Sequence, residues 1–503
     1  MPGAVVTPPN DAAAAAPDSA QVPDKGLRRG AIGLVSSVVI GVASTAPGYS
    51  LAATLGLIVA AVGVQAPAVL WVAFVPMLCI ASAYLYMNRS DPDCGTTFAW
   101  VTSAIGPWAG WLGGWAIIAA DVVVMANLAQ IAGLYSFTLV GWEAAAASTV
   151  AVTALGVLWI VLMTAITVAG IELSARTQWY LLGAELTALA LFATVALVRV
   201  YLGDAPAAAQ HPQSSWFSPF AIDGGTGALT GGVLLAVFIY WGWDSAVSVN
   251  EETANPARAP GRAAMLSTVL LVGIYVLVAT AAIAFAGPDR LSGEEDALSI
   301  LGTDVLGGTL DSVLIVAVLT SAAASTQTTI LPTARTTLSM ARSGALPAGL
   351  GLVHARHMTP HVATLLFGAV SILWYAGLTI VSQNILYDSI AALGLMIAFY
   401  YGLTGFACAL YHRRQARHSA KALLFAVIAP GAGAVILAWV LVRSVLDLSD
   451  PANSASGDAW LGLGPPLVIG AGLMVLGALL MLAYSRREPA FFARRPAALD
   501  ERR

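Results

Sequence analysis

The feature that most constrains this chain is a series of long apolar runs. A helix needs roughly 20 apolar residues to cross the hydrocarbon core of a bilayer. Twelve such stretches can be marked out, at approximately 31–62, 66–87, 107–138, 148–170, 175–202, 228–250, 262–287, 309–341, 361–382, 386–411, 421–444 and 463–484. The connections between them leave no room for a soluble catalytic domain. The sequence therefore predicts an all-α polytopic membrane protein with twelve transmembrane helices, and not an enzyme.

The composition supports the same class. Charged residues make up only 10% of the chain and hydrophobic residues 58%, whereas a soluble globular protein has roughly 25% charged residues. The expected surroundings are a lipid bilayer, with no nucleic acid partner. Three scattered cysteines and six histidines near loops or span ends form no disulfide framework or metal-ligand spacing, so we predict no cofactor and no metal.

The distribution of basic residues predicts the orientation. If the N-terminus is cytoplasmic and there are twelve spans, 20 of the 23 Lys and Arg fall on the inner side, as the positive-inside rule requires. We therefore expect a multi-pass protein of the cell membrane with both termini in the cytoplasm. The expected parts are a disordered tail (1–27), a core of spans 1–10 (28–411), spans 11 and 12 (412–484) and a basic C-terminal tail (485–503).

The first span contains a break signal at its centre, "GVASTAPGYS", residues 41–50. Pro47 has no backbone N–H and clashes with the preceding helical turn, and Gly48 follows it directly. One interpretation is a kinked helix, which is common in membranes. The other is a discontinuous helix, whose second half would present free N–H groups that bind anions.

The sixth span carries a second break signal, "WGWD", at residues 241–244. Two interrupted helices five spans apart indicate an inverted-repeat transporter. On this hypothesis the repeats cover about 28–203 and 227–411, and spans 11 and 12 are additional C-terminal helices.

Three stretches resemble one known family. They are "FIYWGWDSAVSVNEETANPARAPGRA" (238–263), "DCGTTFAWVTSAIGPWAGWLGGW" (93–115) and "ARTTLSMARSGALP" (334–347). They are similar to the sixth-span signature, the loop into the third span and the end of the eighth span of the amino acid–polyamine–organocation superfamily of permeases. The resemblance covers spans 1–10. It implies a LeuT-type five-plus-five fold and alternating-access transport of amino acids or related amines.

The sequence departs from that family at two positions. Members commonly carry Gly-Ser/Thr-Gly in the first break, where this chain has "GVASTAP". In some proton-coupled members a lysine of the fifth span occupies a former sodium site. Alignment through "SART" (174–177) places Glu185 at the position of that lysine. Because of these two departures, the resemblance determines neither the substrate nor the coupling ion.

Ionisable groups inside membrane spans are rare and usually functional, and the candidates in this sequence are Asp121, Glu185 and Asp244. Asp244 is the leading candidate to bind a substrate amine or a coupling proton, or else it caps the second half-helix. Asp121 would favour an amine, or else it links two helices. Glu185 is a candidate proton carrier, or else it holds the fifth span against the first or eighth.

The resemblance implies further substrate contacts. The backbone of the first break would receive a substrate carboxylate, if there is one, and Phe238 would close over the substrate as a gate. Trp241 could offer a cation–π face, and Met125 shares the pocket-facing side of the third span with Asp121. Thr329 matches a substrate-contacting position in the eighth span, although hydroxyls there also pack helices. The predicted substrate contacts are Ala43, Ser44, Thr45, Ala46, Gly48, Asp121, Met125, Phe238, Trp241, Asp244 and Thr329.

The glutamates Glu251 and Glu252 end the sixth span near Arg258 and Arg262, and we interpret them as a cytoplasmic gate network. The sequence thus predicts a secondary transporter that imports an amino acid or a related amine, coupled to protons. The alternatives are a polyamine importer, an amine or amino acid exchanger, and a nutrient sensor that binds without flux. The sequence leaves the oligomeric state open.

Overall fold

The structure is a computed structural model, which describes residues 24–294, 296–307, 312–381, 383–454 and 456–496. Most of the predicted N-terminal tail (1–23) and the last part of the predicted C-terminal tail (497–503) lie outside the described residues. The described chain is helical, and its β-structure is limited to two isolated bridges, Ile32–Thr253 and Trp460–Leu463. The all-α polytopic membrane fold is confirmed.

Within the described residues, ten helical segments are long and apolar enough to cross a membrane. The main helices are α1 (Leu34–Ser44), α2 (Pro47–Val62), α3 (Ala66–Ser90), α5 (Pro107–Leu139), α7 (Thr149–Ala169), α8 (Ile171–Leu202), α9 (Gly225–Ile239), α11 (Ala259–Ala286), α14 (Ser312–Arg342), α15 (His361–Val381), α16 (Gln383–His412), α18 (Ala429–Asp447) and α19 (Pro465–Arg487).

The ten segments differ from the twelve predicted spans at two places. The first two predicted spans fall within one helical segment, Leu34–Ser90, because only a short 3₁₀ turn (Gly63–Gln65) separates α2 from α3. The sixth predicted span begins as the shorter apolar helix α9, which ends at Ile239. The count of twelve therefore stays a prediction.

The first predicted break is confirmed. Helix α1 ends at Ser44, and α2 begins at Pro47. Between them Ala46 adopts the left-handed conformation, with φ 46° and ψ 62°. Proline is well suited to the first position of a helix because its missing N–H would have no helical partner there. The span is discontinuous and not merely kinked.

The second predicted break is also confirmed. Helix α9 ends at Ile239, and the chain becomes helical again only in the single turn α10 (Ser245–Ser248), followed by a 3₁₀ turn, Asn250–Glu252. Gly242 has φ 115°, a value that a residue with a side chain rarely adopts. All of α10 is buried.

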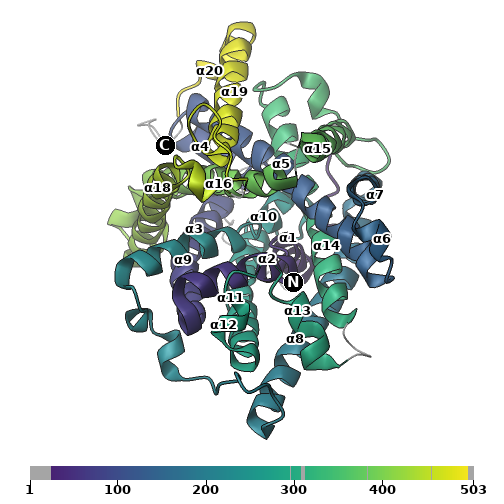
Figure 1. Cartoon of the computed structure of the whole chain (residues 1–503). Helices are drawn as coiled ribbons and strands as arrows, with labels where there is room; N and C mark the ends of the chain where they lie inside the picture. Colours follow the sequence, from purple (N-terminus) through teal and green to yellow (C-terminus); the bar gives the residue numbers. More distant parts are fainter. Residues whose placement is uncertain (1–23, 295, 308–311, 382, 455, 497–503) are drawn as a thin grey trace, which may run out of the picture.

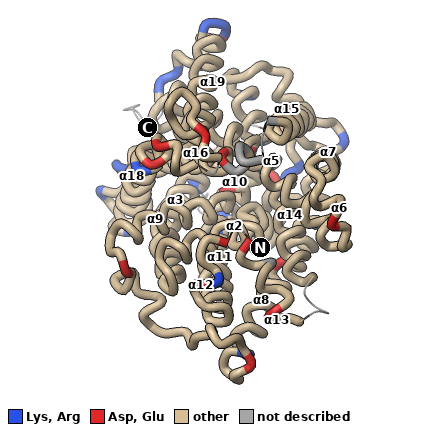
Figure 2. The backbone as a smooth tube through the Cα atoms, viewed as in Figure 1, with Lys and Arg blue, Asp and Glu red and all other residues tan. Residues whose placement is uncertain are grey.

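The interrupted helices lie in the middle of the molecule (Figure 1). In that view α1, α2 and α10 occupy the centre, and the longer helices surround them. Helix α14 packs against α5 and α8, α11 packs against α3 and α1, and α16 packs against α18, α19 and α5. Figure 2 shows that Lys, Arg, Asp and Glu are sparse along the part of the backbone that the structure describes.

Two short helices cover one end of this bundle. Helix α4 (Thr97–Ala104) lies in the aromatic linker 89–115 and packs against α5 and α16. Helix α20 (Pro489–Phe492) packs against α19 and the start of α5. Its Phe491 stacks on Phe98, with ring centroids 5.8 Å apart.

Candidate functional site

The two breaks touch each other. A Cβ atom added to Gly242 would lie 2.6 Å from the carbonyl oxygen of Ser44, so only glycine allows this approach. The hydroxyl groups of Ser44 and Ser245 are hydrogen-bonded at 2.8 Å. The interruptions of spans one and six therefore form one unit at the centre of the fold.

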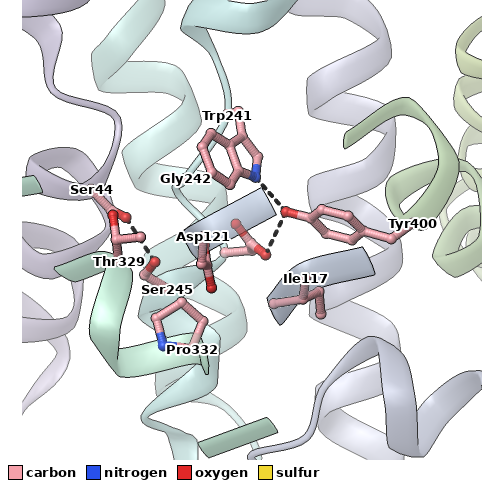
Figure 3. A pocket seen from close by; sticks show the side chains of 10 residues that line it. Ser44, Ile117, Asp121, Trp241, Gly242, Ser245, Thr329, Pro332 and Tyr400 are labelled. Atoms are coloured by element: carbon pink, nitrogen blue, oxygen red, sulfur yellow. Dashed lines mark hydrogen bonds between the residues drawn. The ribbon is translucent and has the colours of Figure 1, made fainter. Parts of the chain in front are cut away.

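A small cavity lies beside this contact (Figure 3). Its volume is about 10 Å³, which is room for about one water molecule. It is lined by Ser44, Ile117, Asp121, Trp241, Gly242, Asp244, Ser245, Thr329, Pro332 and Tyr400. The cavity thus brings together five of the predicted site residues, which come from α1, α5, the second break and α14. They are Ser44, Asp121, Trp241, Asp244 and Thr329.

Asp244 is buried and accepts hydrogen bonds from three tyrosines. Its Oδ1 accepts from the hydroxyl of Tyr401 at 2.8 Å. Its Oδ2 accepts from Tyr400 at 3.3 Å and from Tyr84 at 3.4 Å. Asp244 occupies the N-cap position of α10, but its side chain makes no capping hydrogen bond. Hydrogen bonds from the phenol groups, and not from the start of α10, stabilise this carboxylate in its buried position.

Trp241 is joined to the same network. Its indole N–H donates to the hydroxyl of Tyr400, which in turn donates to Asp244. Figure 3 draws the hydrogen bond between Trp241 and Tyr400 as a dashed line. The N–H is therefore directed at the protein. Such connected hydrogen bonds polarise and orient one another.

Asp121 forms the second acidic part of the cavity wall. Its Oδ2 accepts a hydrogen bond from Thr333 of α14 at 2.7 Å. Asp121 thus lines the cavity and also links two helices, and its preference for an amine stays a prediction. Ile117, one turn earlier on α5, also lines the cavity.

Met125, one turn after Asp121, has different neighbours. It packs in a buried apolar cluster with Ile160 and Tyr375 and is not among the residues that line the cavity. Phe238 is half-buried on α9 and is likewise not part of the lining. Thr329 does line it, and its hydroxyl donates to the carbonyl of Ser325 at 2.7 Å.

The start of α2 is occupied by the protein itself. The N–H of Gly48 donates to Oε1 of Glu185 at 2.7 Å, and the N–H of Tyr49 donates to the hydroxyl of Ser321 at 3.2 Å. Glu185 is fully buried and holds the fifth span against the first, as one of its two interpretations requires. Its role as a proton carrier stays a prediction.

The remaining N–H groups of the first break are also engaged. Thr45 donates to the carbonyl of Val42, and Ala46 donates to that of Ala43, each at 3.1 Å. Pro47 has no N–H to offer. The backbone donors that were expected to receive a substrate carboxylate are therefore all satisfied within the chain.

A network of buried charges lies at the end of the second break. Lys25, which precedes α1, pairs with Glu251 at 2.6 Å and with Asp93 at 2.8 Å. Burial alone would lower the pKa of Lys25, but Cys94, Asp93 and Glu251 raise it above its ordinary value. Burial raises the pKa of nearby Asp91 to about 6. This network joins the N-terminal segment to the loop after α3.

Glu252 has a different partner. Arg335 of α14 donates to both of its carboxylate oxygens, at 2.7 and 3.0 Å, and both side chains are fully buried. Arg258 and Arg262, which the sequence suggested as neighbours, do not form the ion pairs; Lys25 and Arg335 do. Sequence proximity was misleading here, because the partners come from other helices.

The sequence reasoning missed the tyrosines. Tyr400 and Tyr401 stand as a pair inside the tenth span, and Tyr84 lies inside the second. A buried phenol hydroxyl usually has a hydrogen-bond partner, so tyrosines far from a membrane interface were an available signal. Asp388 of α16 is a further fully buried carboxylate that was left out of the acidic set.

Two interrupted helices that meet at a buried, acid-lined cavity, within a bundle of membrane-length helices, define a multi-span membrane transporter. The model of a family described as "Amino acid permease" matches residues 29–472. The chain belongs to this family, and the resemblance noted from its sequence is confirmed.

Several relatives are transporters by name. An uncharacterized transporter of Mycobacterium tuberculosis is 31% identical over 361 residues, which is 70% of this chain and 74% of the relative. Asc-type amino acid transporter 1 of Mus musculus is 24% identical, covering 78% of this chain and 69% of the relative. Large neutral amino acids transporter small subunit 2 of Homo sapiens is 25% identical, covering 64% and 58%.

Proposed function

We propose that this protein is a secondary active transporter of the cell membrane, with both termini in the cytoplasm, which imports an amino acid or a related amine by alternating access. The observation that carries the proposal is the small cavity between the two helix breaks, with Asp121 and Asp244 in its wall. The names of two relatives, which are amino acid transporters, support the substrate class.

The inner ion pairs supply a gate for this mechanism. Lys25 ties the segment before α1 to Glu251, and Arg335 ties α14 to Glu252. Opening the cavity toward the cytoplasm would require these pairs to separate. A buried charge that loses its partner is strongly destabilising. These ion pairs would therefore separate only when water enters and solvates the separated charges.

We further propose protons as the coupling ion and Glu185 as their carrier. A charged carboxylate accepts a stronger hydrogen bond than a neutral one. Protonation of Glu185 would therefore weaken its bond to Gly48 and loosen α2 from α8. This event would connect proton binding to movement of the first broken helix.

The experiment is uptake of labelled alanine, leucine and putrescine into proteoliposomes, with and without an inward proton gradient. We expect accumulation of at least one compound, stimulated by the gradient. Glu185→Gln should abolish the stimulation while leaving exchange of substrate intact. Glu172→Gln is the matched control, because Glu172 lies on the same helix with 54% of its side chain exposed.

Two results would count against the proposal. Binding of a compound without any flux would indicate a nutrient sensor. Unchanged gradient stimulation in Glu185→Gln would remove this residue from the coupling mechanism.

A further inference from the structure

We infer that a surface groove between α8 and the start of α14 binds one anionic phospholipid, with an acyl chain along α8 and the phosphate at Arg176. The groove is separate from the central cavity, since the two share no lining residue. Its volume is about 660 Å³. Binding of a lipid there is independent of which compound the protein transports.

The lining of the groove is apolar and has small side chains on one side. Residues of α8 face valines of α14, among them Gly183, Ala184, Thr187, Val313 and Val316. The hydroxyl of Thr187 donates to the carbonyl of Gly183 at 2.7 Å, so it requires no polar partner from a ligand. Such a lining is a match for a hydrocarbon chain and not for a headgroup.

The length of the groove corresponds to one leaflet of a bilayer. Along α8 the lining extends from Trp179 to Leu191, a rise of about 18 Å at 1.5 Å per residue. One leaflet supplies about half of the hydrocarbon core, whose full thickness is about 30 Å. A partner helix that crosses the membrane would need the full thickness, so a single acyl chain is the better match.

Two aromatic residues mark one end of the groove. The side chains of Trp179 and Tyr180 are 47% and 73% exposed. The indole N–H of Trp179 donates to the hydroxyl of Ser36 on α1 at 3.3 Å, which fixes the ring at this end. Because Trp and Tyr favour the interface between membrane and water, this end of the groove lies at the level of the lipid headgroups.

Arg176 supplies the charge at the same end. It is exposed, and it shares a face of α8 with Tyr180 and Gly183, since residues three or four apart align on a helix. Glu172, the nearest acid along α8, is paired with Arg28 at 2.8 Å, and Arg176 forms no ion pair with any described residue. An arginine can bind a phosphate through two parallel N–H donors. An anionic headgroup is favoured over a zwitterionic one because it brings no cation of its own to the phosphate.

The test titrates dioleoyl phosphatidylglycerol and dioleoyl phosphatidylcholine onto the purified full-length protein in detergent, with thermal stability as the readout. We expect phosphatidylglycerol to bind about fivefold more tightly, which is the contribution of one basic residue near anionic headgroups. Phosphatidylglycerol with a photoreactive group in its acyl chain should cross-link to residues 179–191 of α8 and 312–316 of α14.

Two substitutions separate the acyl chain from the headgroup. Gly183→Leu fills the groove, and a Cβ at Gly183 meets nothing within 4 Å, so the fold is preserved. It should weaken binding of both lipids at least about tenfold, because it excludes about two methylene groups from the groove. Arg176→Gln should remove the preference for phosphatidylglycerol and leave the binding of phosphatidylcholine unchanged.

The matched controls are a glycine and an arginine elsewhere on the exposed surface. A Cβ at Gly273 of α11 also meets nothing within 4 Å, and Arg262 is exposed at the start of α11. Gly273→Leu and Arg262→Gln should change neither lipid affinity. Equal affinity of the wild type for the two lipids, unchanged binding in Gly183→Leu, or an unchanged preference in Arg176→Gln overturns the inference. Cross-links confined to other helices, or a stable dimer that covers α8 and excludes the lipid, would do the same.

Discussion

Replacing Gly242 by alanine tests the contact between the two helix breaks. The new Cβ would lie 2.6 Å from the carbonyl oxygen and 2.8 Å from the carbonyl carbon of Ser44, and 3.1 Å from the nitrogen of Thr45. These neighbours are backbone atoms, so they cannot turn aside as a side chain would. In addition, the φ of 115° is strained for any residue with a Cβ.

The expected loss of stability combines these two effects. A residue held in a sparsely populated backbone region costs about 1–3 kcal/mol, and overpacking a well-packed core costs about 1–3 kcal/mol. Gly242→Ala should therefore lower the free energy of unfolding by about 2–6 kcal/mol. It should also lower the affinity for any ligand of the cavity, because Gly242 lines it.

The assay is denaturant unfolding of the purified protein in detergent micelles, with Gly231→Ala as the matched control. Gly231 lies in the same broken span, on α9, and a Cβ there would meet nothing within 4 Å. The control should be neutral or stabilising by about 0.5–1 kcal/mol, since alanine favours a helix over glycine. If Gly242→Ala unfolds within about 0.5 kcal/mol of the wild type, the close contact of the breaks is refuted.

Three further substitutions test other contacts. In Gly56→Ala the new Cβ would overlap the carbonyl oxygen of Glu294, so the loop after α11 should detach from α2. Faster hydrogen exchange of that loop would reveal the detachment, and unchanged protection would contradict the contact. Burial raises the pKa of Asp91 to about 6, above roughly 3.9 in an unfolded chain, so the native state holds this proton more tightly than the unfolded state does. The protonated carboxyl therefore stabilises the fold fully below about pH 4, and this stabilisation is lost as the pH rises through 6. In unfolding experiments between pH 4 and pH 7, the free energy of unfolding of Asp91→Asn should rise by about 1–3 kcal/mol relative to that of the wild type. A difference in unfolding free energy between the two proteins that does not vary with pH would refute this. Lys25→Met should lower the free energy of unfolding by about 3–5 kcal/mol, because it leaves buried carboxylates without a cation. The control Arg29→Met changes a side chain that is 63% exposed and should alter the free energy of unfolding by no more than about 0.5 kcal/mol. Equal effects of the two substitutions would contradict the buried network.

Much of the fold was accessible from the sequence because its causes are local. A proline removes an N–H wherever it stands, so Pro47 marks the first break without knowledge of any neighbour. A glycine followed by a carboxylate in an apolar run marks the second in the same way. The acids of the cavity were also found from the sequence, since charge inside a membrane span is costly and rare.

The partners of these residues could not be found in that way. Asp244 and Tyr401 are 157 residues apart, and Lys25 and Glu251 are 226 residues apart. The sequence suggested Arg258 and Arg262 for the glutamates because they are near in the chain. The same limit applied to Gly48, whose N–H was expected to be free for a substrate and is held by Glu185.

The sequence by itself determined the class of protein, the places where two helices are interrupted and the acidic character of the centre. Each of these depends on what a residue does in a membrane regardless of its neighbours: an apolar run is buried in lipid, a proline ends a hydrogen-bonded turn, a carboxylate needs a partner. Only the tertiary structure decided which partner each group has. Partner choice depends on helices that meet far apart in the chain, and here it placed tyrosines around Asp244 and a glutamate at the start of α2.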